Sequence, residues 1–138
     1  MLNNFLNLNS ENNFDQEKSM IPISIVANIL NVHQRTLRIY DEENILRPNR
    51  SGKNRRLYSL NDIEKGKFIQ YLSRDLGINI AGIKVILHFV EQKNLPINKY
   101  YEYVEEIAQS LNITVEMQEQ NREKLSKRGR KPNKISVG

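Results

Sequence analysis

Residues 23–58 carry two short helical patterns separated by only three residues, Asn31 to His33, which leaves room for a tight turn. In the first pattern, apolar residues recur at steps of three and four behind Ser24, which we interpret as the N-cap; they are Ile25, Val26, Ile29 and Leu30. Asn31 follows directly, and asparagine is the non-glycine residue that best tolerates the left-handed backbone of a sharp corner. A second helical pattern, at residues 34–43, comes next. This order predicts a helix-turn-helix.

The second of these helices is predicted to read DNA. Leu37 and Tyr40 or Asp41 lie on its apolar side, whereas polar and cationic side chains lie toward its start. A recognition helix has this construction, because its N-terminal end must reach the base edges. The DNA-binding residues predicted here are His33, Gln34, Arg35, Thr36, Arg38 and Tyr40.

A basic hairpin is predicted after the recognition helix. Asn44 stands where the helix must stop, and Ile45 and Leu46 return to the core. Pro48 then favours an extended entry, and residues 51–54, Ser-Gly-Lys-Asn, favour a turn. We interpret residues 47–58 as a two-stranded wing with five cations. The DNA-binding residues predicted in this wing are Arg50, Lys53, Asn54, Arg55, Arg56 and Tyr58.

These residues resemble the MerR-type winged-helix regulators and, within them, the HspR-type repressors of chaperone operons. The resemblance covers about residues 22–87, and the segments that carry it are Thr36-Leu37-Arg38-Ile39-Tyr40-Asp41, Asn44-Ile45-Leu46, Pro48 and Arg56-Leu57-Tyr58-Ser59. Asn31 and Asn44 depart from the pattern, since they stand where glycine is usual, and Ile39 replaces a frequent tyrosine. The resemblance implies a dimer formed through an antiparallel helix after the winged domain, and a chaperone acting as co-repressor.

Two further helices are predicted as a scaffold for the helix-turn-helix. Ser59 and Asp62 have the spacing of a capping box at the start of the third helix, and Gly77 closes that helix. Asn79 is expected to cap a fourth helix, whose apolar residues keep to one face until Leu95 and Pro96.

From Ile97 the apolar period changes to alternating steps of four and three, which is a heptad seam. We predict a dimer interface at Tyr101, Val104, Ala108, Leu111 and Val115. The alternative is a helix that packs on its own domain, since the seam is shorter than about three heptads.

The predicted fold class is therefore all-α with a small β wing, a winged helix-turn-helix followed by a C-terminal dimerisation helix. The expected parts are a disordered arm (1–19), the DNA-binding domain (20–92), the dimerisation helix (97–122) and a basic disordered tail (123–138). Residues 122–134 carry seven positive charges against one negative charge, so the tail is either solvated or lies on DNA phosphates.

Composition narrows the function. A net charge of +5 favours an anionic partner, and the absence of cysteine excludes disulfides and thiolate nucleophiles. No apolar run of about 18 residues and no signal-peptide pattern occurs, so we expect a cytoplasmic protein. Neither His33 nor His88 has a second ligand at a fixed local spacing. We predict no enzyme, no cofactor and no metal site.

The predicted function is a dimeric, sequence-specific repressor of heat-shock chaperone operons, bound to inverted repeats at promoters. Three alternatives stay open: a MerR-type activator or repressor that answers another signal, an architectural DNA-binding protein, and a coiled-coil adaptor.

Overall fold

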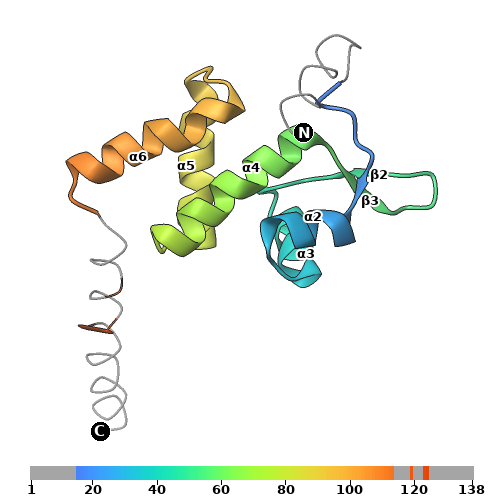
Figure 1. Cartoon of the computed structure of the whole chain (residues 1–138), viewed down its shortest axis with the longest axis horizontal. Coiled ribbons are helices and arrows are strands. Elements are labelled where there is room, and N and C mark those ends of the chain that lie inside the picture. Colours follow the sequence, from blue (N-terminus) through green and yellow to red (C-terminus); the bar gives the residue numbers. More distant parts are fainter. Residues whose placement is uncertain (1–14, 114–118, 120–122, 125–138) are drawn as a thin grey trace, which may run out of the picture. The chain divides into compact units, whose positions relative to one another are not determined.

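The computed structural model describes residues 15–113, 119 and 123–124, and it divides the chain into two compact units between Lys67 and Phe68. The boundary falls within helix α4 (Figure 1). The elements of the first unit are β1 (Ile21–Pro22), α2 (Ile23–Leu30), α3 (Gln34–Glu42), β2 (Asn49–Arg50), β3 (Arg56–Tyr58) and the first part of α4 (Leu60–Gln70). Those of the second are the rest of α4, the π-helical turn η1 (Tyr71–Asp75), α5 (Ile80–Gln92), the 3-10 turn η2 (Ile97–Lys99) and α6 (Tyr100–Ser110).

The corner between α2 and α3 has the predicted geometry. Asn31 is left-handed, with φ 54° and ψ 50°, and its N–H reaches back to the carbonyls of Ala27 and Asn28. The predicted N-cap at Ser24 is wrong, because the helix already begins at Ile23 and Pro22 occupies the cap position. Proline has a fixed φ and no N–H to donate, so it suits the junction between a strand and a helix start.

The wing is a three-stranded antiparallel sheet in the order β1-β3-β2. Strands β2 and β3 correspond to the predicted two-stranded wing, whereas β1 was not predicted. Ile21 lies opposite Tyr58, and Arg50 lies opposite Arg56. The short strand before α2 therefore ties the entry of the helix-turn-helix to the wing.

The core of the first unit gathers apolar side chains from α2, α3, α4, β3 and the loop after α3. Its buried residues are Val26, Ala27, Leu30, Leu37, Tyr40, Ile45, Leu46, Tyr58 and Ile63. The predicted capping box holds the start of α4: the Ser59 N–H donates to Asp62 Oδ2 at 2.9 Å, and the Asp62 N–H donates to Ser59 Oγ at 3.0 Å.

Residues 15–19, the end of the predicted arm, are hydrogen-bonded to the first unit. The Asn49 side-chain amide donates to Ser19 Oγ at 2.8 Å, and the Asn61 N–H donates to the Gln16 carbonyl at 3.1 Å. The rest of the arm lies outside the described residues, as does the tail from residue 125 onward.

In the second unit, Gly77 and Asn79 lie at helix ends, as predicted. Gly77 has φ 65°, and Asn79 caps α5 by accepting the Gly82 N–H at 2.9 Å. Its buried apolar residues are Phe68, Ile69, Leu72, Ile83, Leu87, Val90, Tyr100, Val104 and Ala108.

The predicted seam on α6 divides into two groups. Val104 and Ala108 are buried within the chain, whereas Tyr101 and Leu111 are exposed. The Tyr101 ring also packs edge-to-face on Tyr71, with centroids 4.5 Å apart. Part of the seam therefore holds α6 on its own unit, as in the alternative interpretation. Val115 lies outside the described residues.

The predicted fold class is confirmed: the described chain is mostly helical, carries a small antiparallel sheet, and continues into further helices after the winged part. Within the same residues, none of the helices combines the length and the apolar character that crossing a membrane requires.

Candidate nucleic-acid interface

Helix α3 presents a polar face beside a buried one. Leu37 is buried in the core, while His33, Arg35 and Arg38 are exposed and Gln34 and Thr36 are partly exposed. Arg38 donates from Nη2 to Gln34 Oε1 at 3.2 Å, one turn earlier. This bond lines two long polar side chains along the exposed face, where they are available to hydrogen-bond base edges.

The tip of the wing is shaped by Ser51. Its hydroxyl oxygen accepts from the backbone N–H groups of Lys53, at 3.3 Å, and Arg55, at 3.1 Å. Asn54 closes the turn in a left-handed conformation, with φ 62°. Lys53 and Arg55, which this turn carries, are both exposed.

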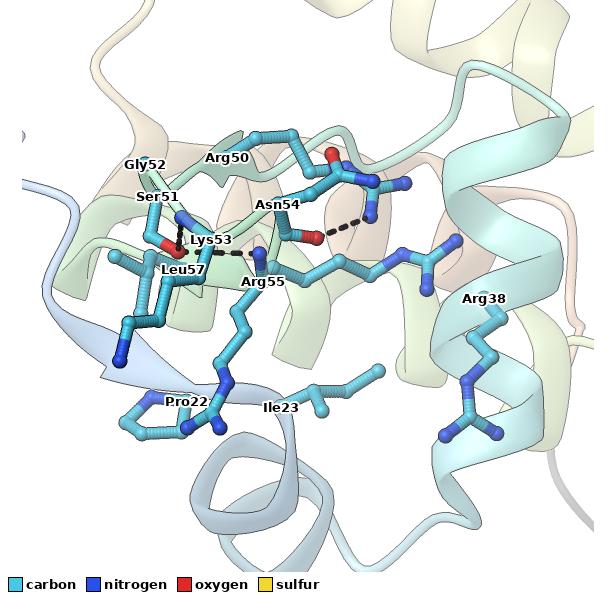
Figure 2. A pocket seen from close by; sticks show the side chains of 11 residues that line it. Pro22, Ile23, Arg38, Arg50, Ser51, Gly52, Lys53, Asn54, Arg55 and Leu57 are labelled. Carbon is cyan, nitrogen blue, oxygen red and sulfur yellow. Dashed lines mark hydrogen bonds between the residues drawn. The ribbon is translucent and has the colours of Figure 1, made fainter.

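A groove of about 550 Å³ runs between the wing and α3 (Figure 2). Five cations line it: Arg38, Arg50, Lys53, Arg55 and Arg56. The apolar residues Pro22, Ile23 and Leu57 also line it. Figure 2 shows Arg38 coming from α3, opposite the residues of the wing. A concave surface with several guanidinium and ammonium groups suits a polyanion such as the sugar-phosphate backbone.

Asp41 connects α3 to the wing. Its Oδ2 accepts from Arg56 Nε at 2.8 Å and from Arg50 Nη2 at 3.3 Å, and Arg47 Nε lies 3.9 Å from Oδ1. Arg50 also donates from Nη1 to the Asn54 carbonyl at 3.2 Å. One carboxylate near the end of α3 thus contacts both strands of the basic hairpin.

Two predicted DNA-binding residues are corrected. Tyr40 and Tyr58 are buried in the core, which leaves the Tyr40 side chain little surface, and the Tyr58 side chain none, for contact with DNA. Among the residues that the structure describes, the Tyr58 hydroxyl finds no hydrogen-bond partner. Burial raises the pKa of Tyr58 to about 12, an effect that Arg56 opposes and Asp41 reinforces.

Sequence reasoning missed the role of Asp41 and the lining positions of Pro22 and Ile23. A carboxylate in the last turn of a helix that precedes a basic hairpin was the available signal. Its arginine partners depend on how the hairpin folds back, so the signal was ambiguous.

The two histidines lie apart from any cluster of potential ligands. His33 is the N-cap residue of α3, and His88 is exposed on α5 beside the Phe89 ring. Over residues 15–113, 119 and 123–124, no group of three or more His, Asp or Glu side chains is arranged to hold a metal ion.

Residues 21–90 match the family model "MerR HTH family regulatory protein". The HTH-type transcriptional regulator GlnR of Bacillus anthracis is 37% identical over 91 residues, which cover 66% of this chain and 69% of that protein. The putative heat shock protein HspR of Streptomyces coelicolor is 43% identical over 70 residues, which cover 51% of this chain and 46% of that protein. A crystal structure of a MerR-family transcriptional regulator from Bacillus cereus superposes with a TM-score of 0.45 at 23% identity, covering 77% of this chain and 82% of that one.

Proposed function

The chain belongs to the MerR family of helix-turn-helix regulatory proteins, and we propose that it acts as a dimeric repressor that binds inverted repeats in promoter DNA. Members of this family are transcription regulators that bind DNA.

The observation that carries the proposal is the groove in which Arg38 of α3 faces the cations of the wing. The major groove of B-DNA is about 12 Å wide and admits one α-helix. With α3 in that groove, its exposed side chains reach base edges, and the wing reaches the flanking backbone. The proposed base or nearby phosphate contacts are His33, Gln34, Arg35, Thr36 and Arg38; the proposed backbone contacts are Arg50, Lys53, Asn54 and Arg55.

A dimer is proposed because one recognition helix reads too few base pairs to select a promoter among genomic sites. Two helices related by a two-fold axis match an inverted repeat. The exposed apolar residues on and just after α6, namely Tyr101, Ile107 and Leu111, are the proposed contacts between protomers. Val104 and Ala108 are buried in the chain's own core, so they hold α6 in place rather than contact a second protomer.

The proposed physiological role is repression of heat-shock chaperone operons in the cytoplasm, with a chaperone as co-repressor. Its support is the HspR-like pattern of residues 36–59 and the relative described as a putative heat shock protein. In this scheme free chaperone assists repression, and unfolded proteins that occupy the chaperone relieve it.

A regulator that answers another signal is the second candidate function. The GlnR relatives favour it, because they align with a larger share of the chain than HspR does and are not described as heat-shock proteins.

Selection of genomic fragments by the full chain, followed by footprinting, tests the proposal. We expect protection of a few inverted repeats at promoters, including chaperone operons, and higher chaperone transcripts in a deletion strain at normal growth temperature. Protection of unrelated promoters with unchanged chaperone transcripts would select the second candidate. Broad coating of DNA would indicate an architectural protein, and no binding to duplex DNA would indicate an adaptor.

A further inference from the structure

The wing contains a pair of arginines whose placement needs an explanation. Arg50 of β2 and Arg56 of β3 lie directly opposite each other in the antiparallel register. Like charges at such positions destabilise a strand pair. The Asp41 carboxylate, which comes from α3 and not from the sheet, accepts hydrogen bonds from both side chains through Oδ2. The hairpin therefore depends on the recognition helix for its charge compensation.

The three arginines around Asp41 are not equivalent. The Arg56 side chain is 19% exposed and makes the shortest contact, at 2.8 Å. The side chains of Arg50 and Arg47 are 42% and 70% exposed, with contacts of 3.3 and 3.9 Å. An exposed ion pair contributes little, and a phosphate oxygen offers a guanidinium the same kind of acceptor as a carboxylate. Arg56 thus suits a permanent link, whereas Arg50 and Arg47 suit exchange between Asp41 and DNA.

We propose that Asp41 is a positioning residue that determines specificity. It holds the wing at a set angle to α3 through Arg56, and it shares Arg50 and Arg47 with the DNA backbone. The inference rests on the DNA-binding function proposed above. It follows that removal of the Asp41 charge affects two kinds of DNA in opposite directions. Binding to the cognate site should weaken, because the wing is no longer aligned with α3. Binding to unrelated DNA should strengthen, because two arginines without a carboxylate partner become available to its phosphates.

The test compares Asp41→Asn with Glu42→Gln, which removes one negative charge from the next residue of the same helix, at an exposed position. A duplex selected by the wild-type protein from a random pool and a scrambled duplex of equal length serve as probes. For Asp41→Asn we expect affinity for the selected duplex to fall about ten-fold, as for a lost charged hydrogen bond. On the scrambled duplex, affinity should rise. The salt slope, which is the slope of log K against log salt concentration, should steepen by about one to two units, one for each new phosphate contact. Glu42→Gln should change neither the slope nor the ratio between the two probes.

The double variant Asp41→Asn with Arg50→Gln should reverse about one unit of the added slope, because one of the released arginines is then absent. Parallel changes on both probes, or an unchanged slope, would overturn the proposal. If Asp41→Asn shows no thermal unfolding transition and is therefore unfolded, the single variant Arg50→Gln tests the proposal instead. It should lower the slope on scrambled DNA by about one while Tm stays within about 3 °C, and an unchanged slope contradicts the sharing. A wild-type protein that prefers no duplex would instead refute the proposed function.

Discussion

Gly66 of α4 packs so closely on Leu30 of α2 that a Cβ atom at position 66 would lie 2.6 Å from Leu30 Cδ1. Leu30 is buried, so its side chain has little room to turn away. This contact sets how near α4 approaches the helix-turn-helix. A side chain at position 66 would force the buried Leu30 side chain to shift.

Gly66→Ala is therefore expected to destabilise the protein. Overpacking costs about 1–3 kcal/mol, and the gain in helix propensity, about 1 kcal/mol, offsets part of it. We expect a net loss of about 1 kcal/mol in the free energy of unfolding, measured by urea denaturation. Gly52→Ala is the matched control, because a Cβ there meets no atom within 4 Å. Equal stability of both variants would contradict the close contact.

Tyr58→Phe is expected to stabilise the protein by about 1 kcal/mol, because it removes a buried hydroxyl for which the described residues offer no partner. Urea denaturation measures the change. DNA affinity should stay the same, since the side chain lies in the core. A loss of affinity in this variant would restore Tyr58 as a DNA contact.

The stability of the protein should fall at high pH, in part through Tyr58. Burial raises the pKa of this residue from its usual value of 10.0 to about 12, so between these values the unfolded chain loses its proton first. Stability is then fully present below pH 10.0 and is lost as the pH rises toward 12. The expected decline is on the order of 1 kcal/mol per pH unit. Urea denaturation at several pH values in this range gives the free energy of unfolding of wild type and of Tyr58→Phe. Plotted against pH, this free energy should decline less steeply for the variant than for wild type.

Arg38→Ala is expected to reduce binding to a selected operator by about 1–3 kcal/mol and to reduce binding to scrambled DNA less, because Arg38 is the proposed base contact. Fluorescence anisotropy with both duplexes measures the difference. Arg55→Ala is the comparison: as a phosphate contact it should weaken both duplexes alike and lower the salt slope by about one. Equal losses on the two duplexes for Arg38→Ala would move it to the backbone contacts.

Leu111→Asp is expected to yield monomers and to abolish operator binding while the winged unit stays folded. Leu111 is 61% exposed, so a carboxylate there disturbs an interface between protomers more than the fold of one chain. Sedimentation velocity gives the oligomeric state, and circular dichroism gives the fold. Gln109→Asp adds the same charge at an exposed neighbouring position and should remain dimeric. A persistent Leu111→Asp dimer would place the interface elsewhere.

Several helix ends were determined by the sequence alone, although the start of α2 was not. Asn31 and Asn44 are left-handed where sequence reasoning expected sharp ends, and Ser59 with Asp62 forms the capping box that its spacing indicates. Such features depend on the conformational freedom of one residue and on partners three positions away, so local sequence contains all of the necessary information. The cationic character of α3 and of the wing was equally readable, because it requires only the residue types.

Only the tertiary structure decided which of these side chains are exposed and which hold the fold. Tyr58 lies in the core although its strand is basic, and Arg56 is bonded to Asp41 fifteen residues earlier. On α6, one apolar heptad pattern contains both the buried Val104 and the exposed Leu111. The physical reason is that burial and ion pairing depend on which distant surfaces meet. A periodic pattern indicates which residues share a face of a helix or strand. Only the folded structure shows what covers that face.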